Sequence, residues 1–208
     1  MGKNIGLIPL GFTEIWSASF NSAIIISAGN NAEFIAFCGI NLDITIFNKE
    51  NVYLPAFLKT YPFLNVEVEN KDKKVNSLIA IDNNPKYVAK DKKIFILDKE
   101  KNLSKQTASK VELIKELNSQ RAVCRRIIAE LKKLDLLIKK DLRVNFEGKE
   151  EKIILEEFYI INIEKLLKLE DKIVASFAKK GWMGIFDAHL KSISNFEKVL
   201  KANKTNVK

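Results

Sequence analysis

Two prolines, Pro55 and Pro62, frame a ten-residue segment that limits how this chain can fold. Each proline fixes its own φ near −65° and disfavours helix in the residue before it, so no continuous helix crosses residues 54–63. Six of the ten residues are apolar and three of them are aromatic, which is too apolar for a free loop. We therefore expect a connector of fixed shape, packed on a core, with a short helical turn at 55–60.

Short runs of β-branched and aromatic residues, separated by turn residues, predict strands in the first half of the chain. No long helix lies between these runs, so the sheet is expected to be mainly antiparallel. The expected strands are at 24–26, 33–38, 42–47, 64–69, 77–81 and 94–97.

The second half of the chain reads mainly as helix. Apolar residues recur every three or four positions from Ser109 to about residue 138, and Ser109 with Glu112 forms a capping box. A hairpin or two extended segments follow at 141–161. Asn162 then caps a helix that Gly181 ends, and a last helix covers about 183–201.

These elements predict an α+β fold in which an N-terminal sheet packs with three C-terminal helices. The chain has 208 residues, enough for one domain or for one domain with an appended subdomain. We expect a β-rich part at 1–105 and a helical part at 106–201 packed on it as a single domain. Residues 202–208 form a basic tail.

The net charge of +9 comes from the chain beyond residue 50. A basic surface attracts nucleic acid, anionic lipid or acidic protein. Here, however, 35 basic residues are interleaved with 26 acidic ones, which favours a solvated lysine-rich surface and argues against nucleic acid as the partner.

Cys38 and Cys124 lie far apart in the sequence and match no metal or redox spacing. With a single histidine the chain cannot supply a common zinc site, so we expect buried thiols, no metal and no cofactor. The apolar run near the amino terminus is too short for a secretory signal, and no run reaches the length of a membrane span. These features favour a cytoplasmic protein without a membrane span.

Three residues are candidates for catalysis. Asp82 and Asp98 each follow a predicted strand, where they could bind a metal, pair as general acid and base, or begin a turn by bonding the backbone two residues on. His189 lies on the apolar stripe of the last helix, where it is either a buried hydrogen-bonded residue or a proton carrier. We favour the turn and the buried residue, and we keep all three as weak catalytic candidates.

Arginine and aromatic side chains are the candidates for ligand binding. Arg121, Arg125 and Arg126 fall on the exposed side of the first long helix, where guanidinium groups could clamp a phosphate or carboxylate or pair with acidic residues of the same chain. The candidate ligand-binding residues are Tyr61, Phe63, Arg121 and Arg125.

Four blocks of the sequence resemble the SapC family of bacterial proteins. They are LPAFLKTYPF at 54–63, IAID at 79–82, ILD at 96–98 and GWMGIFDAHLKS at 181–192, and their order and spacing agree with that family over roughly residues 33 to 200. Lys59 stands where arginine is frequent in the family. The family is named after surface-array-associated proteins, so the resemblance implies an accessory role in a surface-layer or envelope system, leaves surface association open and implies no defined reaction.

Three classes of function follow. The favoured one is a binding protein for a protein or peptide partner, because the chain has no nucleophile elbow, Walker A or dinucleotide motif. An enzyme is the second, and it requires Asp82, Asp98 and His189 to meet in one pocket. Nucleic-acid binding through the basic helices is the third. The sequence does not set the oligomeric state.

Overall fold

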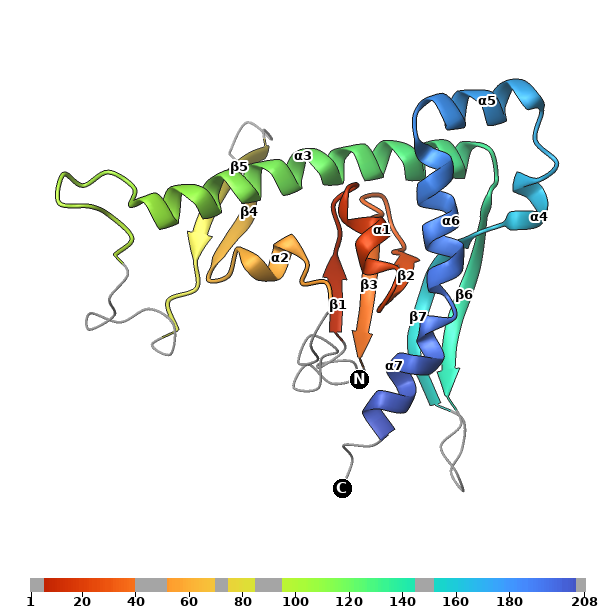
Figure 1. Ribbon diagram of the computed structural model, residues 1–208, viewed down its shortest axis with the longest axis horizontal. Coiled ribbons are helices and arrows are strands. Elements are labelled where there is room, and N and C mark those ends of the chain that lie inside the picture. Colours follow the sequence, from red (N-terminus) through yellow and green to blue (C-terminus); the bar gives the residue numbers. More distant parts are fainter. Residues whose placement is uncertain (1–5, 40–51, 70–74, 85–94, 145–151, 205–208) are drawn as a thin grey trace. The chain divides into compact units, whose positions relative to one another are not determined.

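The computed structural model describes residues 6–39, 52–69, 75–84, 95–144 and 152–204 (Figure 1). The chain divides into two compact units. Unit 1 comprises Met1–Pro55 and Gln120–Lys208, and unit 2 comprises Ala56–Ser119. The long helix α3, Lys105–Lys133, contributes to both. The boundary expected at residue 105 therefore differs from the boundaries of these units.

A five-stranded sheet forms the centre of unit 1, in the order β1-β3-β2-β7-β6, and every strand pair in it is antiparallel. The expected antiparallel pairing is confirmed, but two strands of this sheet come from the C-terminal half, where the predicted hairpin is found, and the strands expected at 64–69 and 77–81 form a separate two-stranded sheet. All four residues of β2 are buried, so the sheet is covered on both faces at its centre. The strands are β1 (Gly6–Pro9), β2 (Ala23–Ile26), β3 (Phe34–Gly39), β6 (Leu137–Val144) and β7 (Lys152–Ile161).

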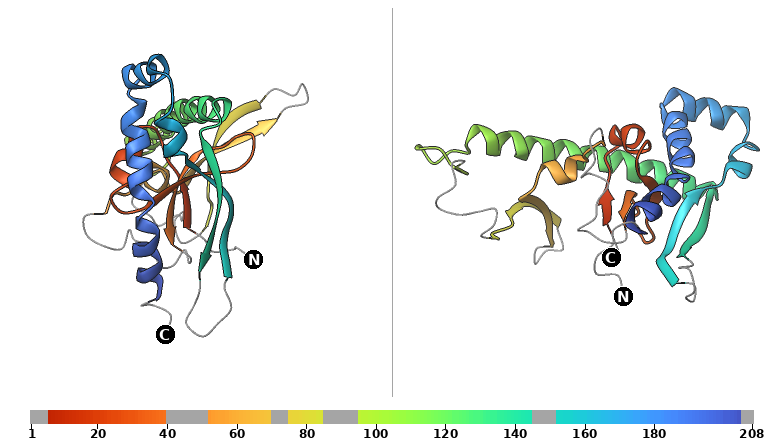
Figure 2. Two further views of the ribbon diagram at one scale, coloured as in Figure 1. Left: turned by 90° about the vertical axis from the view of Figure 1, so that its right-hand side faces the viewer. Right: turned by 60° about the horizontal axis from the view of Figure 1, so that its bottom comes forward.

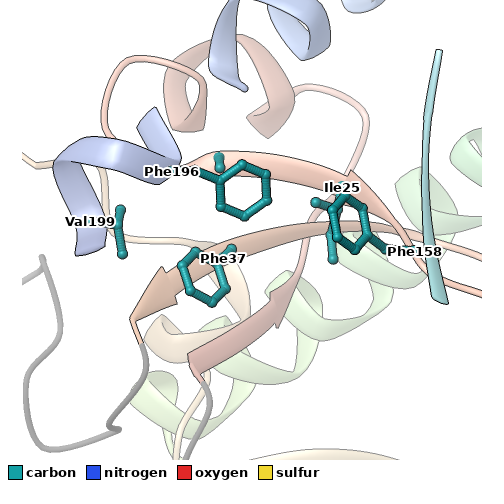
Figure 3. Close-up of a cluster of buried hydrophobic side chains, with 6 residues drawn as sticks. Ile25, Phe37, Phe158, Phe196 and Val199 are labelled. Carbon is teal, nitrogen blue, oxygen red and sulfur yellow. The ribbon is translucent and has the colours of Figure 1, made fainter. Parts of the chain in front are cut away.

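Helices α6 (Trp182–Ser192) and α7 (Asn195–Lys204) follow one another along one face of this sheet, over β2, β3 and β7 (Figure 2). Phe196 of α7 packs its ring at 5.3 Å from that of Phe37 and at 5.8 Å from that of Phe158 (Figure 3). Ile25 of β2 and Val199 of α7 belong to the same cluster. Aromatic rings from β3, β7 and α7 thus join the two halves of the chain in one core.

The last two of the three expected C-terminal helices are each broken in two. Asn162 caps a helix as predicted, its Oδ1 accepting from the Lys165 N–H at 3.1 Å, but α4 covers only Ile163–Leu166 and α5 begins at Asp171. Gly181, with φ +72°, lies beyond the end of α5 (Asp171–Lys179), which confirms the predicted stop. The last helix is interrupted between α6 and α7.

The start of α3 differs from the prediction. The helix begins at Lys105, and Ser104 caps it, since its Oγ accepts from the Thr107 N–H at 3.3 Å. The capping box expected at Ser109 is therefore wrong: that hydroxyl donates to the Lys105 carbonyl inside the helix. A helix start depends on which hydroxyl reaches a free N–H, and two serines compete here. Asp135, with φ +53°, follows the other end of α3.

Two short elements near the amino terminus were not expected from the sequence. They are β1 and α1 (Glu14–Ala18), and α1 packs against α6.

Unit 2 contains a short helix, a hairpin and the first part of α3. Helix α2 (Ala56–Lys59) is the turn that the prolines predicted, and it leads into β4 (Phe63–Glu69), which pairs antiparallel with β5 (Val75–Ile81). Lys110 of α3 donates to the carbonyl oxygens of Lys59 and Tyr61. Since Pro55, Ala56, Thr60 and Phe63 are buried, the segment is a packed connector as expected.

One predicted strand is not found in the described residues, and another falls outside them. The strand expected at 94–97 is wrong in its described part, where Leu97 forms a single bridge with Leu103. The one expected at 42–47 lies outside the described residues. None of the helices in the described ranges is long and apolar enough to cross a membrane.

The cluster around Phe196 predicts which phenylalanines stabilise unit 1. Phe37→Ala should lower the free energy of unfolding by about 3–5 kcal/mol, because Phe37 is fully buried and its loss leaves a cavity. Phe20→Ala, at a side chain 49% exposed, is the control and should cost less than about 1 kcal/mol. Urea denaturation measures both, and equal losses would contradict the assignment of the core.

Candidate functional site

A row of three buried polar residues runs along α6 into α7, on the side that meets the sheet. His189, Ser192 and Asn195 are spaced three residues apart and are 0%, 0% and 2% exposed. Burying such groups is costly unless each finds a hydrogen-bond partner. Their hydrogen-bond partners therefore show whether these three residues have a structural role.

His189 and Ser192 bond to the strands at the place where β2 and β7 separate. These strands pair only at Ile26 and Tyr159. Two residues further along that antiparallel register, Ile24 would lie opposite Ile161 as the next pair of the same kind. Instead, the Ile24 N–H donates to Ser192 Oγ at 2.9 Å, and the Ile161 N–H donates to His189 Nε2 at 3.1 Å. Two side chains of α6 thus replace the missing step of the ladder.

His189 is an uncharged acceptor in this arrangement. Burial lowers the pKa of His189 to about 3, so the ring is neutral at physiological pH. Because Nε2 accepts, the proton belongs on Nδ1, which has no hydrogen-bond partner in the described part of the chain and lies in a ring with an edge contact to Phe34. The prediction that His189 is buried and hydrogen-bonded is confirmed.

Ser192 and Asn195 extend the same network. Ser192 Oγ donates to the His189 carbonyl at 2.6 Å while it accepts from Ile24. Asn195 Nδ2 donates to the carbonyl oxygens of Ser19 and Ser22, at 2.7 and 3.2 Å, and so holds the connection between α1 and β2. Sequence reasoning missed Asn195, because it lies inside the single helix expected at 183–201, where an asparagine has no evident partner.

Asp82 and Asp98, both in unit 2, form turns. Asp82 accepts from the Asn84 N–H at 3.0 Å and Asp98 from the Glu100 N–H at 2.9 Å, each two residues on, which confirms the turn interpretation. Asp82 also accepts from the Tyr61 hydroxyl, and these hydrogen bonds lower the pKa of Asp82. No hydrogen bond joins Asp82 to Asp98 among the described residues, and an enzyme that uses them with His189 stays a prediction.

The arginine pair bonds within its own unit. Arg121 and Arg125 both donate to the carboxylate of Glu33, Arg121 through Nη2 at 2.7 Å and Arg125 through Nη2 at 2.9 Å. Glu33 lies just before β3 and is only 13% exposed, so the two guanidinium groups compensate a largely buried charge. The alternative that these arginines meet an acidic residue of the same chain is confirmed.

The remaining candidates are also engaged inside the protein. Phe63 is 7% exposed, and the half-buried Tyr61 uses its hydroxyl on Asp82. Both cysteines are buried, as predicted, and burial raises the pKa of each thiol to about 12. Within the described ranges no three side chains of metal-ligating type gather in one place.

One buried carboxylate was missed by sequence reasoning. Glu14 of α1 is 4% exposed and accepts from the Gly11 N–H at 2.8 Å and from the Tyr53 hydroxyl at 2.9 Å. Burial, followed by the charge of Glu14, raises the pKa of Tyr53 above its usual range. Nothing in the local sequence distinguishes this glutamate from a surface one.

The buried histidine predicts a pH dependence of stability. The unfolded chain takes up a proton at His189 below about pH 6.5, whereas the folded chain does so only near pH 3, so stability falls as the pH drops through this window. The free energy of unfolding should fall by about 2 kcal/mol between about pH 7 and pH 5. Since the chain has one histidine, His189→Gln should remove this slope, and an equal slope in both proteins would contradict it.

Because Ser192 accepts the hydrogen bond of the Ile24 N–H, Ser192→Ala should have a local effect at Ile24. The Ile24 N–H would lose its acceptor, at a cost of about 1–3 kcal/mol, and its amide should exchange faster in hydrogen-exchange NMR. Ser194→Ala is the matched control, because that exposed hydroxyl only donates to the Lys191 carbonyl. If both variants leave Ile24 exchange unchanged, the serine is not its acceptor in solution.

Comparison with known proteins gives one result. The family model for SapC matches residues 1–199, which cover the residues that suggested the resemblance. No curated protein and no solved structure matches the chain. The match extends over nearly the whole sequence and includes His189 and Ser192. The chain therefore belongs to the SapC family.

Proposed function

We propose that this chain is a binding protein that engages a polypeptide partner through the β4–β5 hairpin of unit 2, as an accessory component of a bacterial surface-layer or envelope system. The observation that carries the proposal is the apolar face of the hairpin. Val66 and Leu78 are direct cross-strand partners, and Val68 lies two residues along the same face. Their exposed fractions are 39%, 54% and 43%.

The register places five apolar residues on one face of the hairpin, beside Asn76, which is opposite Val68; the five are Leu64, Val66, Val68, Leu78 and Ala80. All five are apolar, and three are large side chains with more than a third of their surface in water. Contiguous apolar surface of this kind marks interaction sites on soluble proteins. A two-stranded sheet is also marginally stable alone, so a partner that covers the face would add needed burial.

Other exposed apolar side chains in unit 2 support a polypeptide as the partner. Phe95, Leu97 and Leu103 are exposed by 68%, 46% and 48%, so apolar side chains outside the hairpin are also open to solvent. Large apolar residues with a polar surrounding are what protein interfaces bury at their centres. Membership of the SapC family supports the surface-layer or envelope setting.

Photo-crosslinking in the bacterium that makes the protein tests this function. A benzoyl-phenylalanine in place of Val66 should capture a second polypeptide, identified by mass spectrometry as a surface-layer or envelope protein. The control replaces Leu167, which is 78% exposed but belongs to unit 1. No capture at Val66, or the same capture at both positions, would overturn the binding site, and a partner outside the envelope would overturn the setting.

Introducing positive charge on the apolar face provides a second test of the binding site. Val66→Lys together with Val68→Lys should reduce the captured product at least about tenfold, because burying an unpaired ammonium in an interface costs more than about 1.4 kcal/mol. Circular dichroism like that of the wild type would show that the variant, including its β4–β5 hairpin, is still folded.

A further inference from the structure

The outer edge of β5 lacks the features by which natural sheets block further pairing. Its sequence, VNSLIAI, has no charged residue and no proline, and Leu78, Ile79 and Ile81 are 54%, 38% and 37% exposed. Proteins normally protect edge strands with lysine, proline, bulges or a covering element. Strand β4, by contrast, carries Glu67 and Glu69 in its sequence. In the described structure β5 has a strand neighbour only on its β4 side.

The ladder shows which backbone groups of β5 point outward. The Asp82 N–H donates to the Pro62 carbonyl at 2.9 Å, so this pair is hydrogen-bonded. Hydrogen-bonded pairs alternate along an antiparallel ladder, which directs Leu78 and Ala80 toward β4 and leaves Ser77, Ile79 and Ile81 facing away. No backbone hydrogen bond to these three from outside the hairpin occurs in the described part of the chain.

We propose that a second copy of this chain pairs its β5 with this edge, antiparallel and about a twofold axis. A register centred on Leu78 pairs all seven residues of the strand, with Ser77 opposite Ile79 and Val75 opposite Ile81. Each of these pairs joins two residues whose backbone groups point outward, so the new ladder uses the groups that the hairpin leaves open. An interface of this kind is isologous and closes at two copies.

The carboxylate that follows β5 favours the antiparallel orientation. Asp82 comes directly after the strand. Antiparallel pairing places the Asp82 carboxylates of the two copies at opposite ends of the interface, whereas parallel pairing would bring these like charges together. The hydrogen bonds that lower the pKa of Asp82 keep its carboxylate ionised at neutral pH. Self-pairing through β4 would instead bring glutamate-bearing edges together.

The pairing yields a four-stranded sheet from two hairpins. Three or more strands with an apolar face are stable where a lone hairpin is marginal, so the second copy supplies what unit 2 lacks. The hairpin faces of both copies would then lie on one continuous sheet. This inference goes beyond the proposed function and does not depend on it, since it concerns the purified protein alone.

A proline on the outward-facing backbone tests the pairing. The wild type should elute as a dimer in size-exclusion chromatography with light scattering, and Ile79→Pro should be monomeric. Proline removes only an N–H that the β4 ladder does not use, so the variant should keep the circular dichroism of the wild type. Ile79→Thr is the matched control, because it removes apolar surface but keeps the N–H, and it should remain dimeric. A monomeric wild type, or a dimeric Ile79→Pro, would overturn the proposal.

A disulfide tests the register. Centred pairing sets Leu78 opposite its own copy at a non-hydrogen-bonded position, where Cα atoms lie about 4.5 Å apart, within the range of a disulfide. Leu78→Cys should therefore give a covalent dimer on oxidation, while Ser77→Cys, opposite Ile79, should not. The native cysteines are buried and do not compete. Equal crosslinking of the two variants, or crosslinking of neither, would contradict the register. If Leu78→Cys in cells instead formed a disulfide with a different polypeptide, that polypeptide and not a second copy would be the partner of this edge.

Discussion

The fold of unit 1 depends on two backbone N–H groups that the sheet itself cannot satisfy. Ile24 and Ile161 would be ladder partners, but β2 and β7 pair at only one residue pair before they separate. A buried N–H without an acceptor costs about 1–3 kcal/mol, and here two lie together in the middle of a five-stranded sheet. His189 and Ser192 supply the acceptors from one helix. The sheet and α6 therefore stabilise one another, and the helix helps to hold strands from the two ends of the chain together.

This arrangement assigns a structural role to the residues that look most chemical in the sequence. A lone histidine next to a serine on a helix resembles part of a catalytic site, yet here both side chains bond to the backbone, and burial keeps the imidazole neutral. The arginines are similarly engaged, with a buried glutamate of the same unit. The polar chemistry of unit 1 stabilises its own fold. The exposed apolar side chains on which the proposed binding function depends lie in the β4–β5 hairpin of unit 2.

The sequence predicted what local chemistry determines and missed what depends on distant pairing. The Asn162 cap, the Gly181 stop, the proline-framed turn and the aspartate turns each depend on a few neighbouring residues, and all are found. The strand order is different in kind, because inserting β2 between β3 and β7 joins residues more than a hundred positions apart. The role of Ser192 is hidden for the same reason: its acceptor function exists only where β2 leaves β7.

The charge distribution explains why an unprotected edge can coexist with a strongly basic chain. Two copies that each carry a net charge of +9 repel one another at long range, and this repulsion opposes nonspecific contacts between them. Such repulsion is screened over about 8–10 Å at physiological salt, so it hardly affects backbone hydrogen bonds at short range. A strand without charged residues, whose following aspartate is kept apart from its copy by antiparallel pairing, is then a place where two copies approach without local repulsion. The lysine-rich surface thus restricts association to a specific edge instead of preventing it.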